Sequence, residues 1–299
     1  MTVKASIDVG TNSILLLVAD VQDGEVFEIH QAISEPRLGR EIEKTGLISQ
    51  ESIADGISSL KSFIETARNF GASEIVIYGT EVFRRASNGE DTISKIETAT
   101  GVPFRLLSQS EEAFYAFKGA LSAEKIGADT LVMDVGGGST EIVAGRLVPE
   151  NWVSRPIGAV IAAEKFSAVP PFGEKHAEII LSKIKAEFRL PFEIEPSKSQ
   201  LIGVGGTITT LGAIKAGLRE YDDKKVVGKK LSTKWLRQIY LDFSRKTPLE
   251  ITKIIPFSPN RADIIAAGCS IYLAFMEMSG LEEIRVSSRG SRWGILLET

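Results

Sequence analysis

Two aspartates, each followed by a turn rich in glycine and hydroxyl side chains, have the residue types and spacing that suit phosphate chemistry. Asp8 lies in "KASIDVGTNSILLLVAD", and Asp134 lies at the matching place in "TLVMDVGGGSTEIVAG". Such turns expose backbone N–H groups, and glycine lets an anion approach the chain closely. We therefore predict two phosphate-binding loops, formed by Gly10, Thr11, Asn12 and Ser13 and by Gly136, Gly137, Gly138, Ser139 and Thr140.

The same two aspartates indicate a divalent metal ion. The carboxylates of Asp8 and Asp134 would repel a bound phosphate unless a hard cation lay between them. Mg²⁺ suits this role because it is commonly held by one or two carboxylates, water and substrate phosphates, and Mn²⁺ could replace it. Each turn alone could equally be a glycine-rich hairpin without a ligand, but the matched pair favours binding.

A third glycine element lies in "GVGGTITTLGA", where Gly205, Gly206 and Thr207 join a predicted strand to a predicted helix. The free N–H groups and the dipole at a helix N-terminus attract anions, which makes this a third candidate phosphate site. The alternative is that these glycines form only a tight strand-to-helix turn. The lysine-containing P-loop motif is missing from the sequence, so a different phosphate-binding arrangement is expected.

Hydrophobic periodicity predicts the elements that must position these loops, and it predicts the same order twice. In the first half, the strands "ASIDV", "ILLLVAD" and "EVFEIHQAI" precede a helix capped by Ser49, the strand "EIVIYG", a helix near residues 90–100, the strand "VPFRLLS" and a helix near residues 109–121. The second half opens with "TLVMDV", "TEIVAGRL" and "NWVSRPI", and continues through helices, the strand "QLIGVGG", more helices, the strand "EIRVSS" and a closing helix.

This repetition predicts an α/β protein made of two similar βββαβαβα domains that face each other across a cleft. No Pro/Ser-rich linker marks the boundary. We place it after Ser122, which gives domains of residues 1–122 and 123–299.

Composition excludes several classes of protein. The chain has 299 residues, 43% hydrophobic and 25% charged, with a formal net charge of -4, which is typical of a globular protein and not of a general nucleic-acid binder. With Cys269 as its one cysteine and with two histidines, it can form neither an internal disulfide nor a histidine-based zinc site. No signal peptide or membrane-spanning run is evident, so we expect a cytoplasmic protein that binds neither DNA nor membranes.

An ordered series of motifs resembles the Ppx/GppA family of exopolyphosphatases and guanosine pentaphosphate phosphohydrolases. The motifs are "DVGTNS", "YGTEVFRRA", "SEEA", "DVGGGSTE", "GVGGTITTL" and "NRADIIAAG", and together they span nearly the whole chain. The resemblance implies the actin-like, ribonuclease H-like fold. It also implies removal of terminal phosphate from inorganic polyphosphate or pppGpp by attack of water with Mg²⁺.

The resemblance also assigns roles to three charged side chains. Glu112 in "SEEA" matches the catalytic base, Glu141 after "GGGST" matches a second glutamate that holds the metal or the water, and Arg84 in "FRRA" matches an arginine that contacts phosphate. A carboxylate that starts a helix could orient the attacking water, although an acid there is also favoured by the helix dipole alone. Glu141 could instead be a polar residue on the outer face of a strand.

Two segments depart from the family pattern. Where members commonly show Asp-x-Gly-(apolar)-Arg-Glu-Gly, this chain has "SSRGSRWG", with Ser288 in place of the acid and Trp293 in place of the glutamate. Val227 replaces a histidine that often precedes the glycine of "DDKKVVGKK", whose lysines could guide a polyanion or could simply be solvated. The proposed catalytic carboxylates are retained.

The leading interpretation is a Mg²⁺-dependent exopolyphosphatase, which could act as a homodimer. A pppGpp 5′-phosphohydrolase would use the same residues. A sugar or acetate-type kinase would use the same paired loops but would need an acceptor, and a (p)ppGpp-binding sensor would bind without turnover. Phosphate release without an acceptor separates the hydrolases from the kinases.

Overall fold

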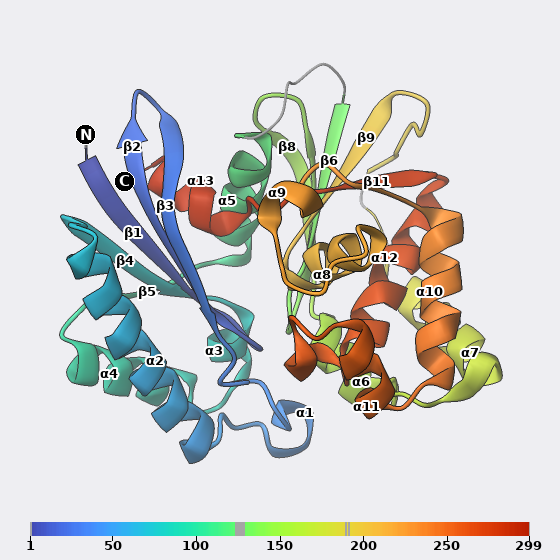
Figure 1. The fold of residues 1–299 in the computed structure, drawn as a ribbon, viewed down its shortest axis with the longest axis horizontal. Helices are drawn as coiled ribbons and strands as arrows, with labels where there is room; N and C mark the ends of the chain where they lie inside the picture. Colours follow the sequence, from blue (N-terminus) through green and yellow to red (C-terminus); the bar gives the residue numbers. More distant parts are fainter. Residues whose placement is uncertain (1, 123–128, 189, 191, 299) are drawn as a thin grey trace. The chain divides into compact units, whose positions relative to one another are not determined.

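The computed structural model describes residues 2–122, 129–188, 190 and 192–298, which divide into two compact units (Figure 1). Unit 1 comprises Met1–Glu124 together with Arg289–Thr299, and unit 2 comprises Lys125–Ser288. The structure therefore differs from the predicted division at residues 289–299, which join unit 1 because the closing helix packs on the sheet of that unit. The predicted boundary after Ser122 borders residues 123–128, which lie outside the described residues.

Unit 1 is built on a five-stranded mixed sheet in the order β3-β2-β1-β4-β5. Its strands are β1 (Thr2–Val9), β2 (Ile14–Gln22), β3 (Glu25–Ser34), β4 (Glu74–Gly79) and β5 (Phe104–Leu106). The first three strands are antiparallel, and β4 and β5 run parallel to β1. Asp8 is one residue from the end of β1, where it pairs with Leu15 on β2 and Tyr78 on β4.

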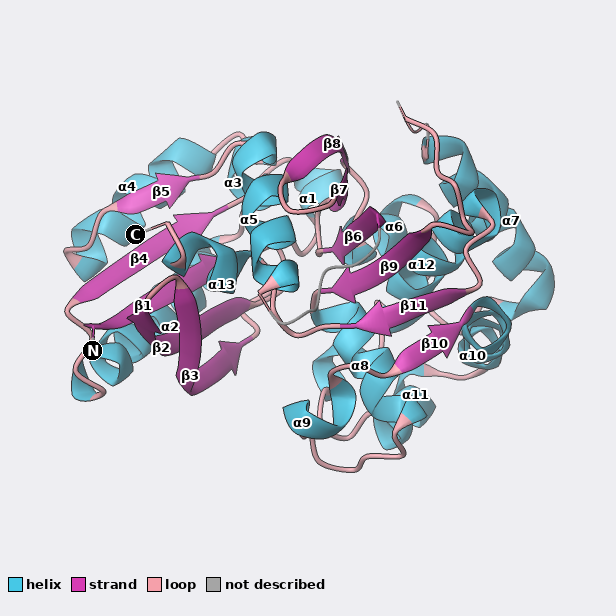
Figure 2. Cartoon of the chain, turned by 90° about the horizontal axis from the view of Figure 1, so that it is seen from above, coloured by secondary structure: helices cyan, strands magenta, loops and turns pink. Residues whose placement is uncertain are grey.

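Helices cover both faces of this sheet (Figures 1 and 2). They are α1 (Ile42–Thr45), α2 (Gln50–Asn69), α3 (Glu81–Arg85), α4 (Gly89–Thr100), α5 (Gln109–Leu121) and α13 (Ser291–Leu296). The Ser49 hydroxyl accepts the N–H of Ser52, so the predicted N-cap of α2 is confirmed. The strands alternate in side-chain direction: Ile14 faces α2, whereas Leu17 packs with Trp293 of α13.

Unit 2 repeats the same strand order with one addition. Its sheet runs β10-β11-β9-β6-β7-β8, and its strands are β6 (Asp129–Val135), β7 (Thr140–Gly145), β8 (Pro149–Arg155), β9 (Ser199–Val204), β10 (Lys230–Ser232) and β11 (Glu283–Val286). Removing β10 leaves the arrangement of unit 1, which confirms the predicted repeat of one α/β unit. The three-residue β10 was not predicted, because so short a segment carries no periodicity.

The core of unit 2 surrounds one nearly all-apolar helix, α12. The helices are α6 (Ala159–Lys165), α7 (Gly173–Glu187), α8 (Gly206–Lys215), α9 (Asp223–Val226), α10 (Thr233–Arg245), α11 (Pro248–Ile254), the 3₁₀ turn η1 (Pro259–Arg261) and α12 (Ile265–Ser279). α12 is buried over most of its length and contacts α6, α7, α8 and α10.

Within the described ranges, no helix combines the length and apolar character needed to cross a bilayer.

Candidate functional site

The first predicted phosphate loop is a four-residue hairpin between β1 and β2. The Gly10 N–H donates to the Ser13 carbonyl at 3.0 Å, and the carbonyls of Thr11 and Asn12 accept the N–H groups of Gly39 and Arg37 at 2.8 and 3.1 Å. The side chains of Thr11, Asn12 and Ser13 are buried, and the Asn12 amide donates to the Ser13 hydroxyl at 3.1 Å. The loop is thus held by its own carbonyls and side chains.

Asp8 lies next to this loop in a polar environment made by two other segments, β4 and α13. Its Oδ2 accepts the Ser291 hydroxyl at 3.5 Å, whereas its Oδ1 is buried without a hydrogen-bond partner in the described structure. Burial raises the pKa of Asp8 to about 6, although the charge of Arg292 and hydrogen bonds from Tyr78 and Ser291 oppose this shift. A carboxylate oxygen that is buried and unsatisfied is suited to bind a cation.

Arg84 and Glu112, which the sequence placed in separate motifs, form an ion pair in unit 1. Arg84 lies in the last turn of α3, and its Nη2 lies 2.9 Å from Glu112 Oε2 and 3.0 Å from Glu81 Oε2. Its Nη1 donates to the Leu107 carbonyl. Burial lowers the pKa of the Arg84 guanidinium, but the charges and hydrogen bonds of Glu112 and Glu81 outweigh this effect, so the pKa is raised.

Glu111 and Glu112 are neighbours with different surroundings. Ser108 and Glu111 form a capping box at the start of α5, and Arg105 pairs with Glu111 at 2.5 Å. The Ser108 N–H and Arg105 lower the pKa of Glu111 to about 2. Glu111 therefore caps the N-terminus of α5, while Glu112 forms an ion pair with Arg84.

Tyr78 lies beside Asp8 in the parallel pairing of β4 with β1. Burial raises the pKa of Tyr78 well above its ordinary value, and the negative charges of Asp8 and Glu112 raise it further. Unit 1 thus holds the loop of residues 10–13 next to Asp8 and Tyr78, and it also forms the Arg84–Glu112 ion pair.

The second predicted loop has the same turn as the first, but a helix packs against its backbone. The Gly136 N–H donates to the Ser139 carbonyl at 3.0 Å, and the carbonyls of Gly136 and Gly137 accept the first N–H groups of α6 at 2.9 Å. A Cβ at Gly158 would lie 2.4 Å from the Gly137 carbonyl carbon, so α6 approaches the loop backbone closely. The buried Thr140 hydroxyl donates to the Ile157 carbonyl at 2.6 Å and is therefore used within the fold.

Asp134 and Glu141 face the same side of the unit 2 sheet, because they are directly paired on the antiparallel strands β6 and β7. Glu141 is buried, and its Oε1 accepts the Ser154 hydroxyl at 2.7 Å. Two acidic side chains at adjacent positions are suited to share a cation, because like charges directly opposite are otherwise destabilising.

The third glycine element lies beside Asp134. Gly205 has a φ of +95°, and a Cβ there would lie 2.8 Å from Asp134 Oδ1. Gly206 begins α8, and a Cβ at this position would lie 2.4 Å from the guanidinium of the buried Arg261. A guanidinium and a helix N-terminus thus lie together in unit 2, and both attract anions. Sequence reasoning did not single out Arg261, although it lies in the motif "NRADIIAAG".

The predicted metal ligands fit Mg²⁺ bound together with phosphate. Over the described part of the chain, no group of three or more His, Cys, Asp or Glu side chains forms a ready metal site. Mg²⁺ keeps several waters and commonly binds one or two carboxylates plus substrate phosphates. Taken separately, the unsatisfied Asp8 Oδ1 in unit 1 and the Asp134–Glu141 pair in unit 2 each have the oxygen donors of such a partial ligand set.

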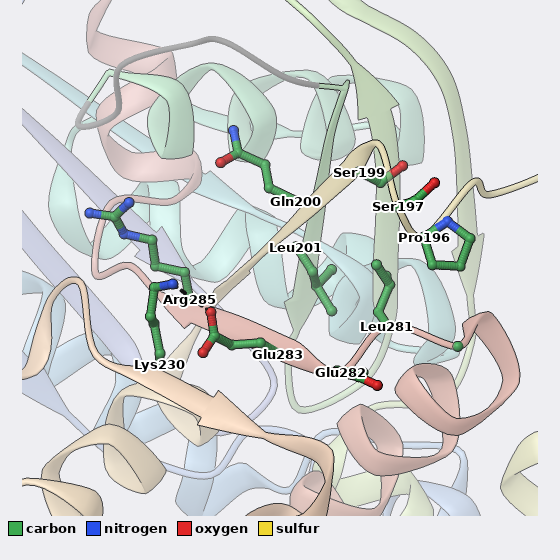
Figure 3. Close-up of a pocket in the computed structure, with 11 residues that line it drawn as sticks. Pro196, Ser197, Ser199, Gln200, Leu201, Lys230, Leu281, Glu282, Glu283 and Arg285 are labelled. Atoms are coloured by element: carbon green, nitrogen blue, oxygen red, sulfur yellow. Dashed lines mark ion pairs between the residues drawn. The ribbon is translucent and has the colours of Figure 1, made fainter.

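A hollow of about 480 Å³ in unit 2 lies apart from these residues (Figure 3). It is lined by the start of β9 at Ser199 and Leu201 and by the Lys230–Glu283 ion pair, with a separation of 2.6 Å. Gly205 follows the opposite end of β9. The hollow therefore does not include the predicted phosphate site.

Known proteins similar to this chain support a common origin. A bifunctional 3-dehydroquinate synthase/phosphatase of Fusobacterium nucleatum is 28% identical over 308 residues, covering 99% of this chain, which spans only 46% of that protein. Exopolyphosphatase 2 of Mycobacterium tuberculosis is 28% identical over 316 residues, covering 99% of this chain and 98% of its own length.

Solved structures show the same fold. The Aquifex aeolicus PPX-GPPA enzyme superposes with a TM-score of 0.83 at 29% identity, covering 100% of this chain and 99% of its own. A crystallised exopolyphosphatase-like protein superposes with a TM-score of 0.91 at 26% identity, covering 99% and 97%. Residues 17–299 match the Ppx/GppA phosphatase family. This chain therefore belongs to the Ppx/GppA phosphatase family and is a hydrolase of phosphoanhydride bonds.

Proposed function

We propose that this protein is an exopolyphosphatase that removes the terminal phosphate of inorganic polyphosphate by attack of water, with Mg²⁺ as cofactor. The observation that carries this proposal is the 2.9 Å ion pair of Arg84 and Glu112 in unit 1. A relative named exopolyphosphatase that aligns along nearly its full length supports the choice of substrate.

Each of these side chains has a role in the proposed reaction. Glu112 orients the attacking water and accepts its proton, while the planar guanidinium of Arg84 binds terminal phosphate oxygens. In the described structure Arg84 binds Glu112 and Glu81, so phosphate binding would require it to share or exchange these carboxylates. Mg²⁺, when bound, would neutralise negative charge on the phosphate oxygens and make the terminal phosphorus more susceptible to attack by water.

Unit 2 contributes anion-binding groups in this proposal. Backbone N–H groups of residues 136–139 and the N-terminus of α8 at Gly206 would bind phosphate oxygens, with Arg261 beside them. Asp134 and Glu141 would hold the metal ion or the nucleophilic water. That both loops serve one substrate remains a prediction from the sequence repeat.

Phosphate release from long polyphosphate, tripolyphosphate, pppGpp and ATP, measured side by side with Mg²⁺, tests the proposal. We expect the highest kcat/KM with long polyphosphate and release without any acceptor. A higher kcat/KM with pppGpp would replace the proposed substrate. Transfer that required a hydroxyl or carboxylate acceptor would identify a kinase, and tight nucleotide binding without release would identify a sensor.

A further inference from the structure

Two buried hydroxyl groups from distant parts of the chain converge on Asp8. The Tyr78 hydroxyl on β4 lies 2.9 Å from the Ser291 hydroxyl on α13, across a separation of 213 residues in sequence. Ser291 in turn donates to Asp8 Oδ2 at 3.5 Å. The other oxygen of the same carboxylate, Oδ1, is buried and has no hydrogen-bond partner in the described structure.

The helix that carries Ser291 is fixed against the sheet of unit 1 by its neighbours. Arg292 donates from Nη1 to the Leu16 carbonyl at 3.1 Å, and its own carbonyl accepts the Ser6 hydroxyl at 3.0 Å. Trp293 is buried, and a Cβ at Gly294 would lie only 1.9 Å from the Tyr115 carbonyl oxygen. Ser291 therefore occupies a position that the surrounding packing defines closely.

The hydroxyl at residue 291 gives Asp8 a hydrogen-bond donor. An apolar side chain there would leave Asp8 without the donor that Ser291 supplies. In this chain the position pairs with Tyr78, whose aromatic body packs in the same apolar cluster as Trp293. The two hydroxyls thus form a small polar network inside an otherwise apolar contact.

We propose that Tyr78 and Ser291 are positioning residues that hold Asp8 Oδ2, so that Oδ1 is directed to the divalent cation of the reaction. This inference rests on the proposed function for the identity of the cation. A carboxylate with one oxygen restrained by hydrogen bonds loses less freedom when its other oxygen binds a metal. Hydrogen-bond partners of metal ligands commonly change metal affinity by about 10-fold to 100-fold when they are removed.

The test is a titration of the metal-free protein with Mn²⁺, in which the electron paramagnetic resonance signal of free Mn²⁺ measures how much of the ion is bound. The variants are Tyr78→Phe, Ser291→Ala and their combination, and Asp8→Asn defines the binding that depends on Asp8. We expect each single variant to weaken Asp8-dependent Mn²⁺ binding by about 10-fold. In phosphate release, the Mg²⁺ concentration for half-maximal rate should rise, while kcat at saturating Mg²⁺ should change less than threefold.

Two other buried hydroxyls provide matched controls. Tyr240 donates to the Ala177 carbonyl at 2.9 Å, and Ser270 donates to the Ala267 carbonyl at 2.6 Å, both within unit 2. Tyr240→Phe and Ser270→Ala remove a buried hydrogen bond without touching Asp8. We expect them to lower the thermal midpoint as much as Tyr78→Phe and Ser291→Ala do, and to leave Mn²⁺ affinity unchanged.

The outcomes separate this inference from the proposed function. Wild-type Mn²⁺ affinity in Tyr78→Phe and Ser291→Ala, or equal losses in the control variants, would overturn the positioning role. A wild-type protein that releases phosphate but binds no Mn²⁺ through Asp8 would also overturn it, with the phosphatase activity still standing. A protein that releases no phosphate but shows the expected loss of Mn²⁺ affinity would refute only the proposed function.

Discussion

The two phosphate loops share one backbone turn but obtain their polar groups in different ways. In each, the N–H of the first glycine donates to the carbonyl three residues later at 3.0 Å, and two successive loop carbonyls accept N–H groups from the segment that follows the third strand. The first loop adds the buried side chains of Thr11, Asn12 and Ser13. The second has three consecutive glycines, and α6 begins directly against its carbonyls.

Both loops thus accept hydrogen bonds from the following segment, and they differ in whether their own side chains add further contacts. Side chains within the first loop restrict its conformation, whereas the glycines of the second would be freer if the N-terminus of α6 did not bind their carbonyls. The charged partners differ correspondingly: Asp8 is surrounded by hydroxyls and Arg292, while Asp134 faces Glu141 across the strand pair and lies beside Gly205. The following predictions test whether the units also differ in function.

Metal removal should have the largest effect, because both aspartates would then face a polyanion without a cation. We expect phosphate release to become undetectable in excess EDTA and to return with Mg²⁺ or Mn²⁺. Asp8→Asn and Asp134→Asn should each raise the Mg²⁺ concentration needed for half-maximal rate. Full turnover in EDTA would contradict the metal requirement, and an unaffected Asp134→Asn would confine metal binding to unit 1.

Glu112→Gln should lower kcat by roughly 10² to 10⁴-fold, because glutamine keeps the hydrogen-bonding shape but cannot accept a proton. The matched control is Glu111→Gln, which keeps an oxygen for the Ser108 N–H and loses only the exposed ion pair with Arg105, so stability and kcat should change little. Steady-state kinetics and chemical denaturation separate the two effects. An impaired Glu111→Gln alongside an active Glu112→Gln would transfer the proposed base to Glu111.

The stability of the metal-free protein should depend on pH through Asp8. Its pKa is raised from 3.8 to about 6 by folding, so the folded state binds a proton more tightly than the unfolded state. The stabilising contribution of this proton is present at low pH and is lost as pH rises toward 6. Relative to Asp8→Asn, the wild type should lose roughly 2 kcal/mol between pH 4.5 and pH 7.

Denaturant unfolding of both proteins across this range measures the effect. A difference between them that stays constant with pH would contradict the raised pKa. Added Mg²⁺ should remove the loss at pH 7 if the cation takes the place of the proton at Asp8.

Two Gly→Ala variants should have the smallest effects, which concern stability and not activity. They compare how tightly each loop is packed. A Cβ at Gly158 would meet the backbone of Gly137, whereas one at Gly39 would meet the Thr11 methyl at 2.1 Å. A side chain can rotate away more easily than a backbone can move, so Gly158→Ala should cost about 1 to 3 kcal/mol and Gly39→Ala less. Thermal unfolding decides the order, and the reverse order would show that the first loop is the more rigid one.

Much of the fold was determined by the sequence alone. Strand alternation, the Ser49 cap and the repeated Asp-Val-Gly turns are local patterns. They correctly predicted the repeated strand order, apart from β10, and the loops between the first two strands of each half, but not the short helices α1 and α3. The same pattern placed Asp8 and Asp134 near strand ends. These features depend on residues close in sequence, so neighbouring residue types suffice to indicate them.

Only the tertiary structure decided which distant residues meet. It places α13 on the sheet of unit 1, joins Arg84 to Glu112, sets Arg261 against Gly206 and brings Tyr78 to Ser291. No local pattern encodes these contacts, because each depends on how separate elements pack and on which side chains remain buried after packing. The same packing leaves Asp8 Oδ1 without a hydrogen-bond partner, a property that no reading of "DVGTNS" could supply.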